Sequence, residues 1–540
     1  MKPYNLLVEP WIPVRRRSGE CSWIAPWQVT EVEDPPLSID TGRPDFDGAL
    51  IQFLIGLVQT AAAPESKKEW RDRFDHPPNG EILRKQFGRF SSAFDLDGDG
   101  PRFMQDHELK PADANEFPIA SLLIESPGEK TIEDNTDLFV KRAGVRSLGL
   151  PMAAAALFSL QTNAPSGGAG YRTSLRGGGP LSTVVLAETL WRTIWLNVLQ
   201  GDEMLQGPGN ADLKALSDSF PWMGPTRTSE KGKRPTTPED VHPLQHFWGM
   251  PRRIRLRFEE SGGQCDVSCL PSKRLVAKFF ATNYGTNYEG AWRHPLTPYS
   301  RKKADDIPLP RKGQPDGIPY RDWPILTMGS AGNEPARVVH AWANDKRSEM
   351  QKDHRLWVFG FDMDNMKARC WHSATTPLLA GDLDGERRER FVAAAQQFVA
   401  ASEDVRKTLV GHVKAALFRR PKDRKGDSFA YVSRTFWAAT ESDFFGAIRR
   451  MHEALTENKD DTPIREEWLG MVQCAALRIF EENSQEAGDF AATDIKRVST
   501  AWNDLRRFTS PRGKKLRGVI GLPPLPNEKL NEEQSEVSNG

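Results

Sequence analysis

Two pairs of residues have the types and spacing of metal ligands. Cys265 and Cys269 lie four positions apart, which is half of a tetrahedral zinc site. Asp362 and Asp364 have one residue between them, so in a strand both carboxylates would face one side and could hold a cation. Neither pair has the remaining ligands beside it, because zinc takes four and hard cations take six or more. The sequence therefore predicts ordinary thiols at the first pair, a structural or contact turn at the second, and no metal.

Nucleophilic chemistry has one weak candidate. Cys370 and His372 would share one face of a strand, but a Cys–His catalytic pair normally comes from distant segments. The ten histidines form no metalloprotease motif, and no G-x-S-x-G turn is present. We therefore expect no enzyme, no catalytic residue and no cofactor.

A glycine-rich segment spans residues 166–179 and holds six glycines in fourteen residues. It lacks the Gly-Lys-Ser/Thr ending of a phosphate-binding loop, and Thr173 stands where a dinucleotide fingerprint needs its third glycine. Glycines would let the backbone approach a ligand closely, and the flanking Arg172 and Arg176 could hold phosphates. A flexible linker between packed elements is the alternative interpretation.

A β-hairpin is predicted near residue 365. Residues 354–361 are mostly apolar, as in a buried strand, residues 362–366 form a polar turn, and residues 367–372 alternate. Its tip would carry Asn365, whose amide suits hydrogen bonding to base edges, and Met366, an apolar wedge of the kind that unstacks bases.

The surrounding elements predict an α+β protein with a large mixed α/β N-terminal domain, residues 1–375, followed by a C-terminal four-helix bundle, residues 376–521. Helices are expected at 46–63 and 182–200 in the first domain. Apolar residues then recur at helical spacing in four successive stretches, as in an up-down bundle. These stretches are 386–418, 441–457, 463–479 and 493–508. The polar tail, residues 522–540, is expected to be disordered.

The composition limits the function classes. The chain of 540 residues has 73 basic and 73 acidic side chains, and this zero net charge argues against a freestanding, non-specific nucleic-acid binder. Local basic patches remain possible. There is no signal-peptide pattern and no long apolar run, and the five scattered cysteines fit a reducing compartment, so we expect a cytoplasmic location.

Several segments together resemble the CasA family, the large subunit of the type I-E CRISPR Cascade complex. The similarity extends over nearly the whole chain. It is carried by residues 5–15, 103–105, 135–139, 170–178 and 292–295. The resemblance implies a mixed N-terminal domain and a helical bundle. It also implies recognition of the protospacer-adjacent motif in double-stranded DNA, mainly from the minor groove, help in opening the duplex for R-loop formation, and recruitment of a helicase–nuclease in antiviral defence.

The resemblance also implies site residues and partners. The partners would be target DNA, CRISPR RNA, the backbone, small and repeat-processing subunits, and the helicase–nuclease, with no membrane. The implied DNA contacts are Gly167, Gly168, Ala169, Gly170, Arg172, Asp364, Asn365, Met366 and Lys367. Some members of the family contact the minor groove with a lysine, and the candidates for that role here are Lys278 first and Asn283 second. A further contact loop would be Asn135, Thr136, Asp137, Leu138 and Phe139.

The chain departs from this family in two places. Some members carry Gln at the hairpin tip, where Asn365 or Met366 stands here, and a zinc site of some members would need cysteines where Gly149 and Met152 stand. Basic residues in two stretches could track the displaced DNA strand or the flanking duplex, or could simply form a solvated face. They are Lys302, Lys303, Arg512, Lys514 and Lys515. A metal-dependent nuclease using Asp362 and Asp364, or a purely structural scaffold subunit, are the alternative functions.

Overall fold

The chain folds into two compact units. One contains Met1–Gly317 and Ile325–Leu378, and the other contains Ile318–Pro324 and Leu379–Gly540. The sequence analysis placed the border between 375 and 376, whereas this division follows Leu378 and assigns a seven-residue insert to the second unit. The computed structural model describes residues 2–135, 144–168, 170–330, 332–345, 347–350, 354–364, 366–379, 383–418, 429–486 and 495–525. The predicted fold class is confirmed.

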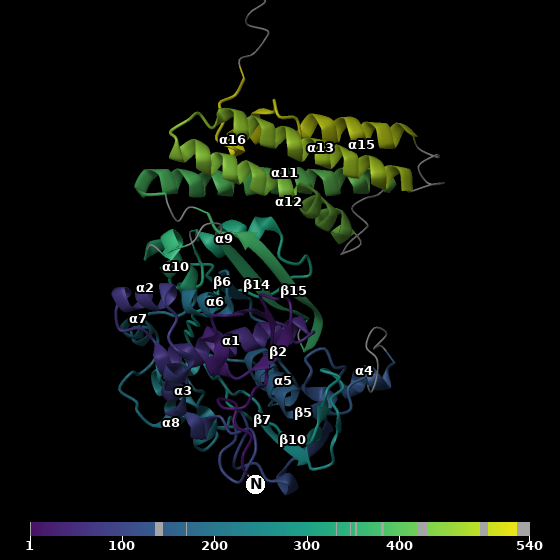
Figure 1. Cartoon of the computed structure of the whole chain (residues 1–540). Helices are drawn as coiled ribbons and strands as arrows, with labels where there is room; N and C mark the ends of the chain where they lie inside the picture. Colours follow the sequence, from purple (N-terminus) through teal and green to yellow (C-terminus); the bar gives the residue numbers. More distant parts are fainter. Residues whose placement is uncertain are drawn as a thin grey trace, which may run out of the picture. The chain divides into compact units, whose positions relative to one another are not determined.

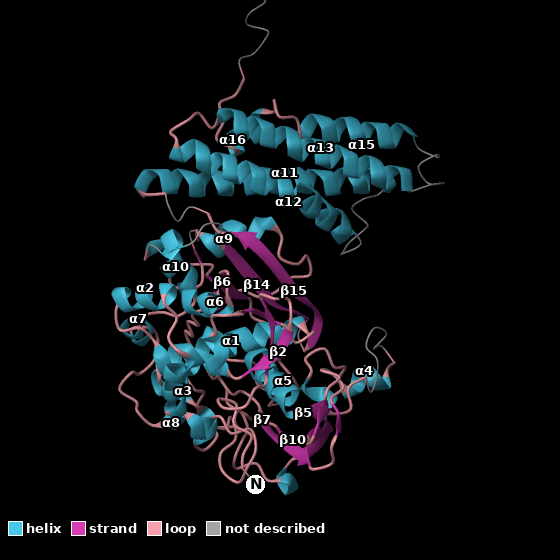
Figure 2. Ribbon diagram, viewed as in Figure 1, coloured by secondary structure: helices cyan, strands magenta, loops and turns pink. Residues whose placement is uncertain are grey.

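Small antiparallel sheets and short helices make up the first unit (Figures 1 and 2). One sheet has the order β2-β1-β3, with β1 Ile12–Arg16, β2 Cys21–Ile24 and β3 Pro36–Ile39. A second has the order β4-β10-β5, with β7 also on β10; these strands are β4 Asn115–Pro118, β5 Leu148–Gly149, β7 Arg253–Glu259 and β10 Leu275–Thr282. A third has the order β15-β14-β6, with β6 Ser182–Leu186, β14 Arg355–Asp364 and β15 Lys367–Pro377.

Helix α1, Pro44–Ala62, forms the centre of the first unit and is buried over most of its length. Its Phe53 makes edge-to-face contacts with five surrounding aromatic rings at centroid distances of 5.2–5.9 Å. Edge-to-face packing is a preferred aromatic geometry and adds to the area that each ring buries. The helix predicted at 46–63 is therefore confirmed. Among the described helices, none combines the length and apolar character needed to cross a membrane.

The helix predicted over residues 182–200 is wrong in its first half. Residues 182–186 form strand β6, which pairs with β14, and α6 covers only Leu190–Leu196. The β-branched run Thr183-Val184-Val185 favours a strand. Thr189 then begins the helix, because its side chain accepts a hydrogen bond from the backbone N–H of Arg192 at 3.3 Å.

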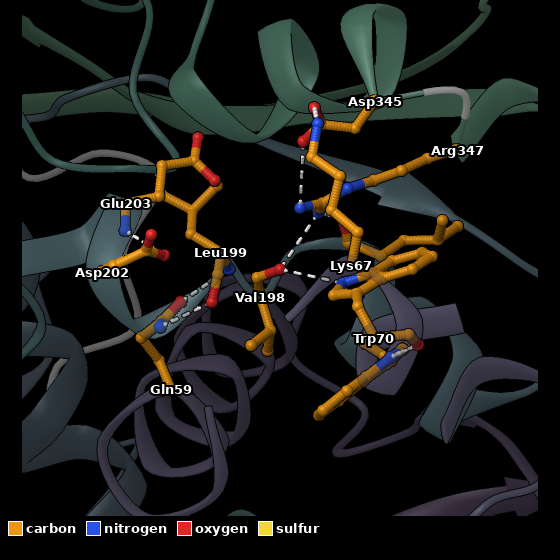
Figure 3. A network of polar contacts seen from close by, with 11 residues as sticks. Gln59, Lys67, Trp70, Val198, Leu199, Asp202, Glu203, Asp345 and Arg347 are labelled. Atoms are coloured by element: carbon orange, nitrogen blue, oxygen red, sulfur yellow. Dashed lines mark hydrogen bonds and ion pairs between the residues drawn. The ribbon is translucent and has the colours of Figure 1, made fainter. Parts of the chain in front are cut away.

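A polar network joins the end of α6 to α1 and α2, Lys67–Asp75 (Figure 3). Gln59 of α1 exchanges two hydrogen bonds with the backbone of Leu199 at 2.7 and 3.0 Å. The carbonyl of Val198 accepts from the indole of Trp70 at 3.2 Å and from buried Arg347 at 3.0 Å. Burial lowers the pKa of Arg347 to about 10. Arg347 also donates to the carbonyl of Leu196 at 3.1 Å, one of the last carbonyls of α6, which have no partner within the helix.

Long helices form the second unit, and all four predicted helices are present. They are α11 Gly385–Leu417, α12 Ala430–Thr456, α13 Thr462–Glu486 and α15 Ile495–Phe508, with a short α16, Lys514–Val519, after them. The predicted apolar stripe of α11 is buried, including Phe391, Phe398, Val405 and Leu409. Leu522 is buried, and residues 526–540 of the expected disordered tail lie outside the described residues.

The insert Ile318–Pro324 completes the core of this helical unit. Tyr320 is buried and stacks on Phe444 with a centroid distance of 4.3 Å, and its ring edge meets Trp437 at 4.9 Å. The Tyr320 hydroxyl lies 3.0 Å from the Thr440 hydroxyl, and burial raises the pKa of Tyr320. A segment that lies about 60 residues before the first of these helices in the sequence thus packs inside the helical bundle.

Removal of the Tyr320 ring should destabilise the helical unit strongly. We expect Tyr320→Ala to cost about 3–5 kcal/mol of unfolding free energy, as for other large aromatic truncations, and Tyr320→Phe about 1 kcal/mol for the lost hydrogen bond. Tyr431→Ala is the matched control, because Tyr431 is 43% exposed on α12. Thermal unfolding of the full chain measures these differences, and equal effects at both positions would contradict the role of the insert.

Candidate nucleic-acid interface

The glycine-rich segment begins where helix α5, Leu150–Asn163, ends. It folds back onto that end, because Ser174 N–H donates to the carbonyl of Ala164 at 3.1 Å. Tyr171 N–H donates to the carbonyl of Gly168 at 3.0 Å, so residues 168–171 make a tight turn. The segment is therefore anchored by hydrogen bonds, which disfavours the flexible-linker interpretation.

Gly170 fixes the segment to the loop that follows β10. Its carbonyl accepts a hydrogen bond from Tyr284 N–H at 2.8 Å. A Cβ at Gly170 would lie 2.9 Å from the Cβ of Asn283 and 3.0 Å from the backbone nitrogen of Tyr284, and its φ is +81°. Only glycine accepts this combination of close approach and left-handed backbone. The bare backbone at Gly170 thus serves contact within the protein.

Gly168 differs from Gly167 because it faces open space. No atom lies within 4 Å of a Cβ built at Gly168, and the residue is exposed. At Gly167 the same position is filled by the side chain of Tyr171. Ala169 lies outside the described residues. Among the described glycines of this turn, Gly168 is therefore the one at which backbone is open to a ligand.

The two arginines of the segment hold other parts of the protein. Arg172 donates to the side chain and the carbonyl of Ser229 at 2.8 and 3.0 Å. Arg176 is buried and donates to Gln52, Ser182 and Thr297 at 2.7–2.9 Å, and burial lowers its pKa to about 10. The expectation that Arg176 holds a phosphate is wrong, because its guanidinium is enclosed by protein.

The far end of the segment packs against the hairpin. A Cβ at Gly179 would lie 2.6 Å from Met363 Cγ and 2.7 Å from the carbonyl oxygen of Phe361, and its φ is +61°. Gly170 and Gly179 thus connect one short segment to two distant parts of the sequence. The structure brings the predicted glycine loop and the predicted hairpin together in this way.

The hairpin itself is confirmed, with strands longer than predicted. Asp362 and Asp364, assigned to the turn, belong to β14. Strand β6 pairs only with the Arg355–Phe359 part of β14, so the distal part of the hairpin has β15 as its strand partner in the described chain. At the tip, Asp364 and Lys367 are exposed, and Met366 is 55% exposed. Asn365 lies outside the described residues.

The structure separates the two candidates for a minor-groove contact. Lys278 lies within β10 and forms an ion pair with Glu116 at 2.7 Å. Thr282, at the end of β10, is four residue steps beyond Lys278, or about 13 Å along the strand. Asn283 follows Thr282 and contacts Gly170 directly. Of the two candidates, Asn283 is therefore the one that lies beside the glycine-rich segment.

Sequence reasoning missed Tyr284. This residue is 40% exposed, has a φ of +60° and lies against Gly170. A non-glycine residue with positive φ is uncommon, and a large exposed aromatic there is a candidate contact. The signal in the sequence was the Asn283-Tyr284-Gly285 triplet directly after an apolar strand, which is typical of a turn.

The remaining predicted contacts are only partly described. Asn135 is exposed with a φ of +51°, whereas Thr136, Asp137, Leu138 and Phe139 lie outside the described residues. The predicted basic residues are exposed, and Lys515 pairs with Asp404 at 2.8 Å. Those exposed residues are Lys302, Lys303, Arg512, Lys514 and Lys515.

Cys265 lines a cavity of about 680 Å³ together with Gly149 and Met152. A Cβ at Gly149 would lie 3.5 Å from the Cβ of Cys265. Gly149 and Met152, which stand where the resemblance implies two zinc-binding cysteines, therefore lie beside Cys265. Glycine offers no side-chain ligand and methionine no thiolate, so two ligands of such a site are missing here.

Comparison with known proteins identifies relatives over nearly the full length. The family model of the CRISPR-associated protein Cse1 matches residues 5–479. The fold is similar to that of Thermobifida fusca Cse1, with a TM-score of 0.71 and 17% identity over 96% of this chain and 98% of that one. The comparison with Thermus thermophilus CasA gives a TM-score of 0.68 and 18% identity, and it covers 96% of this chain and 100% of that one. The comparison with a chain of a CRISPR RNA-guided surveillance complex gives a TM-score of 0.67 and 18% identity, and it covers 94% of this chain and 100% of that one.

Alanine substitutions should distinguish the two glycines of the turn. We expect Gly170→Ala to cost about 1–3 kcal/mol of stability, because it adds a Cβ where space and φ both exclude one. Gly168→Ala, at an open position two residues away, is the control and should change stability little. Thermal unfolding of both variants tests this, and a harmless Gly170→Ala would show that the turn adapts freely.

Proposed function

Because the chain belongs to the Cse1 family of CRISPR-associated proteins, we propose that it is the large subunit of a type I-E CRISPR RNA-guided surveillance complex. The family model covers residues 5–479, and a similar fold occurs in a chain of such a complex. In this proposal the subunit recognises the protospacer-adjacent motif in double-stranded DNA, helps to open the duplex and recruits a helicase–nuclease. It performs no chemistry itself.

The observation that carries DNA recognition is the open backbone at Gly168 beside the Asn283-Tyr284 loop. Gly170 joins these two loops through a backbone hydrogen bond of 2.8 Å, so they act as one surface. Because glycine has no side chain, the backbone amide of Gly168 and nearby polar side chains can approach a DNA groove closely. An aromatic side chain such as Tyr284 adds a ring that can contact sugar or base faces.

Duplex opening is assigned to the hairpin tip. Unstacking a base step costs a few kcal/mol, and proteins offset this cost by inserting an apolar side chain. Met366 is such a side chain and is largely exposed, with the charged side chain of Lys367 beside it for the phosphate backbone. Because Gly179 packs on Met363, the tip and the glycine turn are held in one unit.

A metal-dependent nuclease is less consistent with the geometry. Asp362 is buried, and its two carboxylate oxygens accept hydrogen bonds from Nε and Nη2 of Arg369 at 2.7 and 2.8 Å. Asp364 also lies 3.7 Å from Arg369. A magnesium ion needs near-octahedral oxygen coordination, whereas the potential ligands beside Asp362 are the sulfur of Cys370 and the nitrogen of His372.

A charge placed at Gly168 should weaken target binding. A carboxylate about 4 Å from a phosphate costs on the order of 1 kcal/mol even in water, so we expect Gly168→Asp to weaken binding about fivefold or more. The assembled complex with its guide RNA is titrated with a paired target at fixed salt, because such affinities depend on salt.

Gly168→Asn provides the matched control, since it adds the same volume without the charge. The proposal predicts a smaller loss for Asn than for Asp. Unchanged binding in both variants would remove this turn from the DNA interface and favour a purely structural scaffold role.

The hairpin tip is tested by separating opening from binding. Met366→Ala should slow strand opening on a fully paired target about tenfold or more, since burying a methionine yields roughly 1.5–3 kcal/mol. A target with mismatches beside the motif is already open and serves as the internal control. If Met366→Ala weakened engagement of both targets equally, the tip would contribute a general DNA contact and would not open the duplex.

A further inference from the structure

Three side chains with metal-ligand atoms gather on one face of the hairpin. The carboxylate of Asp362, the thiol of Cys370 and the imidazole of His372 all lie within 4.8 Å of one another. Strand register explains the cluster, because Asp362 is directly opposite Cys370. His372 lies two residues farther along β15, on the same face as Cys370.

The ligand atoms of this cluster point toward one another. The Cys370 Sγ lies 3.3 Å from the His372 Nε2. The other ring nitrogen, Nδ1, faces the turn at Gly317, where a built Cβ would lie 3.7 Å away. Asp362 is held in place by its two hydrogen bonds with Arg369. A carboxylate has about four lone-pair positions, so these two bonds leave room for one more partner.

We propose that Asp362, Cys370 and His372 bind a zinc ion, with a water molecule as the fourth ligand. Sulfur, nitrogen and oxygen donors are the set that zinc accepts, whereas calcium and magnesium require oxygen ligands throughout. The Cys370 thiol loses its proton to solvent as the Zn–S bond forms, and Nε2 of neutral His372 supplies a lone pair. No redox step is involved.

Electrostatics in the cluster agree with this assignment. Partial burial and the charge of Asp362 raise the pKa of Cys370, and the smaller opposite effect of Arg369 does not cancel this. A divalent cation would reverse this effect, because it stabilises the thiolate beside the carboxylate. Zinc affinity should therefore fall as the pH is lowered and protons compete for the thiolate.

A zinc ion here would brace the distal hairpin. It would join β14 to β15 next to the register shift between Asp362 and Met363, where the ladder is irregular. The site lies two residues from Asp364 at the tip. Zinc binding requires no nucleic acid, so it is testable on the full chain alone and stands independently of the proposed function.

Cobalt titration of the full-length chain tests the site. Bound to a thiolate, Co²⁺ gives a sulfur-to-metal absorption band, and added Zn²⁺ should abolish it by competition. We expect Cys370→Ser to remove the band and to weaken Zn²⁺ binding at least about tenfold, as losses around metal sites do. His372→Ala should weaken binding similarly.

Two controls separate this site from the other thiols. Cys265→Ser/Cys269→Ser removes the half-site beside the 680 Å³ cavity and should keep the band. Cys474→Ser removes another exposed thiol and should also keep it. No band in the unaltered chain, or a band that survives Cys370→Ser, would overturn the proposal. Because Cys370 is exposed, its substitution should leave the fold intact, which thermal unfolding without metal verifies.

Discussion

Close packing around two glycines is the constraint on which the site depends. Gly170 lies against the Asn283-Tyr284 backbone and Gly179 lies against Phe361 and Met363, each with a positive φ and no room for a Cβ. The eight residues between them therefore set the spacing of two loops that are remote in sequence. Arg176, buried between the two glycines, binds Gln52 of α1 and so fixes the segment to the central helix.

Regular elements were largely predictable from the sequence, because they depend on local patterns. The helices of the second unit follow from apolar residues at helical spacing, and the hairpin follows from an apolar run, a polar turn and an alternating run. The failure at residues 182–186 has a tertiary cause. The short run of residues 182–186 favours a strand only weakly through its β-branched side chains, and pairing with β14, about 170 residues later, decides it.

The candidate site was less predictable, since its residues meet through long-range contacts. Glycine content indicated close backbone approach, but not that Gly170 and Gly179 contact protein while Gly168 remains open. Arg176 has the sequence context of a phosphate ligand, and only its burial shows a structural role. Likewise, the proposed zinc site has a third ligand besides Cys370 and His372, because the strand register places Asp362 opposite Cys370.

The insert Ile318–Pro324 has a consequence for how the protein can be divided. The chain passes between the two units three times, at 317/318, 324/325 and 378/379, rather than once. A fragment that begins at residue 379 would lack Tyr320 and Trp323 and would expose the aromatic walls they cover, including Phe444. A single proteolytic cut near residue 379 would not release the helices either, because the insert stays embedded in them. The helical unit is thus not a transferable module, and fusion or exchange between relatives must carry both segments together.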